Sequence, residues 1–170
     1  VRFEAGDRAV DAPFSLRVHR TQAPSRYALK SIHWLHPEPD NVTTGKQPEW
    51  WSERHWQLLE NAGRTLRAFG DTSVLTPVLG MQASVGVTIR KDGSYAFDFT
   101  QFDRWIETFT RLGFEEFDGH HAASWHRTPA FDERTGKKVT LFRWGRIGHD
   151  PDTLKFLDAF YPALYAHLRE

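Results

Sequence analysis

Three short apolar segments, each followed by a helical pattern, constrain the fold of this 170-residue chain more than any other feature. Strands are expected at 27–35, 73–80 and 114–117, and helices at 52–69, 100–112 and 150–170. Strands that alternate with helices are typical of a parallel sheet, and a chain of this length can bury a real core. We therefore expect an α/β domain built from three successive βα units.

The first and last helices carry boundary signals. Ser52 is a favourable N-cap, and Gly70 supplies a left-handed stop. Asp150 and Pro151 suit the N-cap and first turn of the last helix. The apolar stripes expected to face the core are Trp56, Leu59, Ala62, Leu66 and Phe69 in the first helix, and Leu154, Leu157, Tyr161, Leu164 and Leu168 in the last.

The middle of the chain predicts a hairpin at 86–99. Asp92-Gly93 favours a turn in which both residues have positive φ. Thr100 and Asp103 form a capping-box pattern at the start of the next helix. After the strand at 114–117, a long loop is expected to run to about residue 149.

Composition excludes several classes of function. Lys plus Arg and Asp plus Glu number 22 each, so the formal net charge is zero, which argues against nucleic acid or an anionic membrane surface as the main partner. The absence of cysteine excludes disulfides and thiolate chemistry. No apolar run approaches the roughly 18 residues that a membrane span needs.

Sites in parallel α/β folds form in the loops after the carboxyl ends of strands. Here those loops are 33–41, 76–84 and 118–126, and they are rich in His, Trp and Asp. Trp stacks on the apolar faces of sugars, while His, Asp and Asn bind their hydroxyls. The predicted carbohydrate-binding residues are Trp34, His36, Asp40, His120, His121 and Trp125.

Other chemistries fit the sequence less well. Neighbouring His120 and His121 point to opposite sides of an extended chain, and no spacing matches a familiar zinc motif. Ser124 lacks the G-x-S-x-G elbow of a nucleophilic serine. We therefore predict no metal and no cofactor.

The chain resembles the catalytic barrel of glycoside hydrolase family 123. The resemblance rests on the ordered segments 34-WLHPEPDN-41, 49-EWWSERHWQLLENAGRTLRAFGDTSVLTP-77, 91-KDGSYAFDFTQFDRWIE-107, 118-DGHHAASW-125 and 158-DAFYPALYAHLRE-170. The family resemblance implies a β-N-acetylgalactosaminidase on a (β/α)8 barrel behind a β-sandwich. It also implies a retaining, substrate-assisted mechanism, and a location outside the cell or in the periplasm.

The same resemblance places the catalytic Asp-Glu pair in an Asp-Glu-Pro-like motif after the fourth strand. No such motif occurs in the 170 residues, so we expect no catalytic residue here and an inactive isolated chain. Three βα units cannot close a barrel that needs eight. We expect residues 27–170 to be the first three units and residues 1–26, with a strand at 16–20, to be a linker and the end of a preceding β domain.

Three functions stay open at this point. The first is the substrate-binding part of a β-N-acetylhexosaminidase-like glycoside hydrolase whose partner is a glycan containing N-acetylhexosamine. The second is a non-catalytic carbohydrate-binding module or pseudoenzyme, and the third is a His-dependent metallohydrolase. The sequence past Glu170 separates the first two, and elemental analysis tests the third.

Overall fold

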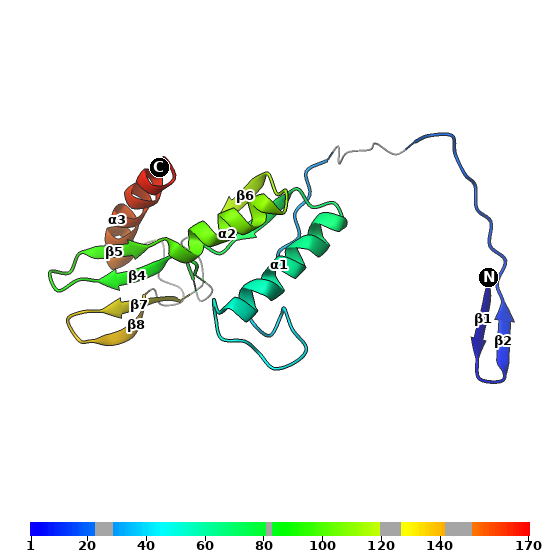
Figure 1. The fold of residues 1–170 in the computed structure, drawn as a ribbon, viewed down its shortest axis with the longest axis horizontal. Coiled ribbons are helices and arrows are strands. Elements are labelled where there is room, and N and C mark those ends of the chain that lie inside the picture. Colours follow the sequence, from blue (N-terminus) through cyan, green and yellow to red (C-terminus); the bar gives the residue numbers. More distant parts are fainter. Residues whose placement is uncertain (23–28, 81–82, 120–126, 142–150) are drawn as a thin grey trace.

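Figure 1 shows the fold, a computed structural model that describes residues 1–22, 29–80, 83–119, 127–141 and 151–170. Its helices are α1 (Glu53–Ala68), α2 (Thr100–Arg111) and α3 (Pro151–His167). Its strands are β1 (Arg2–Ala5), β2 (Arg8–Asp11), β3 (Ser73–Thr76), β4 (Gly86–Ile89), β5 (Tyr95–Asp98), β6 (Glu116–Gly119), β7 (Thr128–Asp132) and β8 (Lys137–Leu141). The mixed α/β class is as predicted. Over these described ranges, no helix combines the length and apolar character needed to span a membrane.

β3 and β6 form a parallel pair, as expected for the second and third predicted strands. Ser73 pairs with Glu116, and Thr76 pairs with Gly119. An apolar cluster joins this pair to α1 and α2, which lie beside it in Figure 1. Its buried members are Trp56, Leu59, Val74, Trp105, Phe109 and Phe114.

Both α1 and α2 end at a glycine in the left-handed region, which the sequence predicted for Gly70. Gly70 has φ 104° and Gly113 has φ 90°. After α1, the N–H of Asp71 donates to the carbonyl of Leu66 and the N–H of Gly70 to that of Arg67. This is the Schellman pattern, which satisfies carbonyls at a helix end. The predicted N-cap of α1 is also confirmed, because the Ser52 hydroxyl accepts a hydrogen bond from the His55 N–H.

The prediction of a long loop between 118 and 149 is wrong, because the described part of this segment contains the β7–β8 hairpin. β7 also pairs in parallel with β4, which gives a four-stranded sheet in the order β5-β4-β7-β8. Pro129 lies in β7 but pairs only with Thr140 of β8. The β4 pairing is confined to the other end of β7, so the proline's missing N–H breaks no bond there.

α3 packs on this four-stranded sheet through a face different from the one predicted. Phe156 and Phe160 are fully buried, and both rings meet Phe97 edge-on. Leu154 and Tyr161 of the predicted stripe are about half exposed, at 50% and 48%. The rings of Phe156 and Phe160 also stack on each other, so this aromatic pair, and not the leucine stripe, forms the centre of the contact. Leu157 and Leu164 remain partly buried beside the same core.

The hairpin at 86–99 is confirmed, but its turn is of another type. Among the described non-glycine residues only Trp51 has positive φ, so Asp92 does not adopt it, whereas Gly93 does at 80°. The N–H of Gly93 donates to the carbonyl of Arg90, and the N–H of Arg90 to that of Ser94. This is a type I turn followed by a left-handed glycine, the next most common hairpin connection.

The predicted capping box at the start of α2 is wrong. Phe99 occupies the N-cap position with no side-chain cap. Asp98 instead accepts hydrogen bonds from the backbone and hydroxyl of Thr100, at 2.9 and 2.6 Å. Asp103 contacts His167 at the end of α3, at 2.6 Å.

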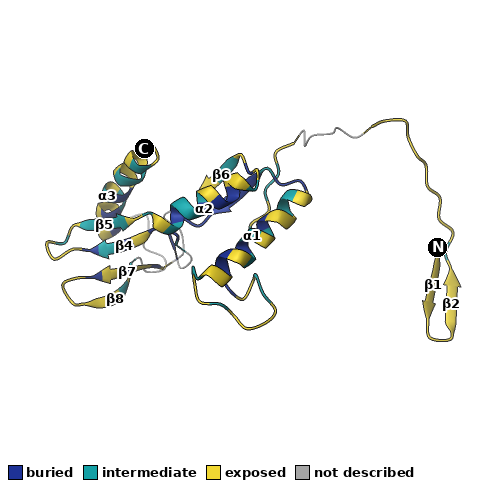
Figure 2. Ribbon diagram, viewed as in Figure 1, coloured by how far each residue is buried: buried dark blue, intermediate teal, exposed yellow. Residues whose placement is uncertain are grey.

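The amino-terminal part holds two further corrections. The strand expected at 16–20 does not form. Strands β1 and β2, which lie before it in the sequence, instead form a hairpin that is exposed throughout (Figure 2). No strand forms over the described part of 27–35. The predicted domain boundary after residue 26 falls in 23–28, outside the described residues.

Candidate functional site

The strand β6 presents two acidic side chains on one face. Successive side chains of a strand point to opposite faces. Phe117 packs into the apolar cluster with α1 and α2, so Glu116 and Asp118 lie on the other face. Across the sheet, Ser73 is the partner of Glu116 and Leu75 is the partner of Asp118. This face of β3 and β6 is therefore polar at several positions.

Glu116 is held by two partners on neighbouring segments. Its carboxylate forms an ion pair with Lys30 and accepts a hydrogen bond from the Ser73 hydroxyl at 3.0 Å. Lys30 and then Ser73 lower the pKa of Glu116, and Glu116 raises the pKa of Lys30 through the same contact. The charges of Lys30 and Glu116 thus neutralise each other.

A cavity of about 580 Å³ opens on this face. It is lined by Lys30, Ser31, Ile32, Ser73, Glu116, Phe117 and Asp118. A volume of this size falls within the range of small-molecule sites. The segment 29–35, β3 and β6 thus contribute side chains to one hollow, although they are far apart in the sequence.

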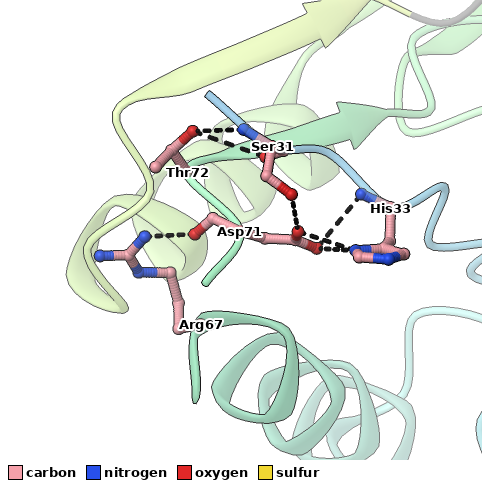
Figure 3. A network of polar contacts seen from close by, with 5 residues as sticks. All are labelled: Ser31, His33, Arg67, Asp71 and Thr72. Atoms are coloured by element: carbon pink, nitrogen blue, oxygen red, sulfur yellow. Dashed lines mark hydrogen bonds and ion pairs between the residues drawn. The ribbon is translucent and has the colours of Figure 1, made fainter. Parts of the chain in front are cut away.

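Figure 3 shows a second polar network, centred on the fully buried carboxylate of Asp71. It accepts hydrogen bonds from the Ser31 hydroxyl at 2.8 Å and from the His33 backbone at 3.2 Å. The His33 ring nitrogen Nδ1 lies 2.7 Å from the same carboxylate. Arg67 donates to the Asp71 carbonyl. Burial alone would raise the pKa of Asp71, but the bonds from Ser31 and His33 outweigh it and lower that pKa.

This network explains why the predicted first strand is missing. Ser31 does lie beside β3, because its carbonyl accepts the N–H groups of Thr72 and Ser73. The N–H of His33, which a continuing strand would give to β3, goes instead to the Asp71 carboxylate. Asp71 precedes β3 at its amino end. The network therefore anchors the segment 29–35 at the amino end of β3. Sites in such folds form at the opposite, carboxyl end of the strands.

The buried His55 of α1 fixes the loop at 36–52 from both ends. Its Nε2 lies 2.7 Å from the Pro37 carbonyl, and its Nδ1 accepts the N–H of Trp51 at 3.0 Å. These partners require the neutral imidazole with its proton on Nε2. Burial lowers the pKa of His55, and the bond to Pro37 opposes that shift. Trp51 has φ 57°, a strained conformation for a bulky residue that this contact helps to hold.

The predicted binding residues fall in three places. Trp34 is 59% exposed and meets His36 edge-on, with ring centroids 6.5 Å apart. Asp40 lines a different hollow of about 470 Å³, together with Trp50 and other residues of the loop 36–50. The remaining predictions, His120, His121 and Trp125, lie outside the described residues.

In the chain's one Asp-Glu dipeptide, Asp132 is the last residue of β7 and Glu133 begins the β7–β8 turn. Asp132 accepts hydrogen bonds from the Arg134 guanidinium at 2.9 Å, which lower the pKa of Asp132. Glu133 accepts the N–H of Lys91 at 3.2 Å. Both carboxylates therefore close hairpin turns. Across the described ranges, no three His, Asp or Glu side chains converge as metal ligands would.

The sequence did not predict the ion pair of Lys30 with Glu116 or the polar network around Asp71. Glu116 was placed inside a buried strand, where an acid invites a search for a basic partner. Lys30 was in the segment predicted to lie alongside, so this pair could have been found. Asp71 carried no signal beyond its position after the helix-ending Gly70.

Comparison with known proteins places this chain in a family of carbohydrate-active proteins. The glycoside hydrolase 123 catalytic domain matches residues 34–170, and the chain belongs to that family. This confirms the resemblance seen in the sequence. No curated protein matches the sequence.

A family 123 glycoside hydrolase from Clostridium perfringens, solved to explain glycolipid glycan hydrolysis, shares the fold. The two structures align with a TM-score of 0.65 and 18% sequence identity. The match covers 81% of this chain and 27% of that one. This chain therefore corresponds to about a quarter of that structure.

Proposed function

We propose that residues 27–170 form the first three βα units of a (β/α)8 barrel and supply part of its substrate-binding surface. The single observation that carries this proposal is the family match over residues 34–170. The parallel β3–β6 pair, with Ser31 beside β3, supports a strand order of 29–35, β3, β6. Residues 1–26 would join the barrel to a preceding β domain.

The proposed activity of the whole protein is that of a retaining β-N-acetylhexosaminidase. In this mechanism the acetamido oxygen of the substrate attacks the anomeric carbon, and an Asp-Glu pair orients it and protonates the leaving oxygen. The Asp132-Glu133 dipeptide is engaged in turns. The catalytic pair would therefore lie beyond Glu170.

The proposed substrate contacts come from the loops that follow the strands. Trp34 offers an exposed ring on which a sugar can stack, and His36 lies at its edge. Asp40 would bind hydroxyl groups, as would His120 and His121, and Trp125 would supply a second aromatic face. The partner is accordingly a glycan that contains N-acetylhexosamine.

The experiment is an assay of the full-length polypeptide with aryl β-N-acetylgalactosaminide and β-N-acetylglucosaminide, followed by proton NMR of the first product. We expect hydrolysis with release of the β-anomer, which shows retention. Release of the α-anomer would overturn the mechanism, and no hydrolysis of either glycoside would overturn the proposed substrate class.

A further inference from the structure

The face of β3 and β6 that bears the cavity has two layers of side chains. The lower layer, at the amino ends of the strands, holds Lys30, Ser73 and Glu116. The upper layer, nearer the carboxyl ends, holds Leu75 and Asp118. Because sites in parallel α/β folds form at the carboxyl ends, the upper layer is the one that faces a ligand.

The two acids of this face differ in their partners. Glu116 accepts from both Lys30 and Ser73. Asp118 is exposed, lines the same cavity, and has no ion-pair or hydrogen-bond partner in the described part of the chain. Within the described residues its oxygens are therefore open to a ligand.

The charge of the cavity follows from the same contacts. Lys30 and Glu116 cancel, and among the described residues that line the cavity Asp118 leaves one negative charge. An anionic ligand would meet a like charge here and would find Lys30 already paired. A neutral polyol would offer hydroxyl donors to a carboxylate that only accepts.

We propose that Asp118 is a specificity-determining residue that accepts hydrogen bonds from the hydroxyl groups of a neutral sugar and disfavours sulfated or acidic sugars. This inference rests on the proposed function for its ligand class, and it names the charge type of sugar that the site takes. Selectivity then comes from an attractive contact to one ligand and a repulsive one to its competitor.

The test uses the full-length polypeptide and measures the Kd of N-acetylgalactosamine and of its 6-sulfate by ligand-observed NMR. Asp118→Asn removes the charge and keeps the shape. Asp118→Ser is a second variant at the same exposed site. Glu115→Gln is the matched control, since it removes one negative charge from an exposed neighbour of β6. Thermal unfolding checks that every variant is folded.

We expect both Asp118 variants to bind N-acetylgalactosamine about 10- to 100-fold more weakly, which is the usual loss for a hydrogen bond to a charged group. The preference for the neutral sugar over the 6-sulfate should shrink in both, while Glu115→Gln should behave like the wild type. Equal Kd values in wild type and Asp118 variants would overturn the inference, as would a wild type that binds no N-acetylgalactosamine. If the sugar binds in a way that depends on Asp118 but neither aryl glycoside is hydrolysed, the inference is supported and only the proposed function is contradicted.

Discussion

Arg104 of α2 donates hydrogen bonds of 2.6 and 2.8 Å to the two carboxylate oxygens of Glu53 on α1. Seven residues further along both helices, Arg111 donates to Glu60 at 2.9 and 3.3 Å. Because the repeat advances in the same direction on both helices, α1 and α2 run parallel. Helices of successive βα units have this relation, so these ion pairs support a repeating fold.

The packing of α1 against α2 depends on Gly63. A Cβ there would lie 2.7 Å from Leu112 Cδ1 and 2.9 Å from Phe109 Cε1, and the Phe109 ring is fully buried. Alanine gains about 1 kcal/mol over glycine in a helix, but overpacking costs about 1–3 kcal/mol. We expect Gly63→Ala to lower the free energy of unfolding in urea by about 1 kcal/mol. Thr65→Ala on the exposed side is the control. A variant more stable than wild type would show that the helices are not in close contact at Gly63.

His55 predicts a loss of stability in mild acid. Burial holds the pKa of His55 below its unfolded value of about 6.5. The unfolded chain therefore binds the proton first, so the contribution of His55 is complete above about pH 6.5 and falls as pH drops through the folded pKa. We expect the Tm of wild type to fall more steeply than that of His55→Gln below pH 6.5. Parallel Tm curves would mean that His55 is not buried in the neutral form.

Asp71 predicts a second, more acidic transition. Hydrogen bonds from Ser31 and His33 overcome burial and hold the pKa of Asp71 below its unfolded value of about 3.9. Its contribution is present above that pH and is lost as pH falls through the folded pKa. At neutral pH we expect Asp71→Asn to lower the free energy of unfolding by about 1–3 kcal/mol. Asp158→Asn, exposed on α3, should have little effect, and equal effects of the two variants would mean that the network adds no stability.

The 170-residue chain alone is expected to leave aryl N-acetyl-galactosaminide and -glucosaminide intact. Its only Asp-Glu dipeptide lies where β7 meets the β7–β8 turn, and both carboxylates are engaged there by Arg134 and the Lys91 N–H. The measurement is nitrophenol release by the purified chain beside the full-length polypeptide. Turnover by the short chain would transfer the catalytic role to acids such as Asp40 or Asp118.

Local signals in the sequence predicted much of the fold. Ser52 and Gly70 marked the limits of α1 because capping is a short-range interaction. The β7–β8 hairpin was missed because Pro129 argues against a strand, and only the limited β4–β7 pairing makes it tolerable. The segment 29–35 alternates like a strand, but a side chain 38 positions away, that of Asp71, takes the His33 N–H.

The candidate site was predicted less completely than the fold. The loops were identified by their position after strands, which named Trp34 and Asp40. The polar contacts of Lys30 with Glu116, and the open carboxylate of Asp118, depend on strand register. Register between strands separated by 43 positions follows from tertiary packing, which local patterns do not encode.

The most direct test of the central claim, that the Glu116–Asp118 face of β3 and β6 belongs to the substrate site of a family 123 barrel, is a crystal structure of the full-length polypeptide with N-acetylgalactosamine. We predict that the sugar lies at the carboxyl ends of β3 and β6, with a hydroxyl about 2.5–3.0 Å from an Asp118 oxygen. A sugar bound elsewhere, with Asp118 paired to another protein side chain, would contradict the account.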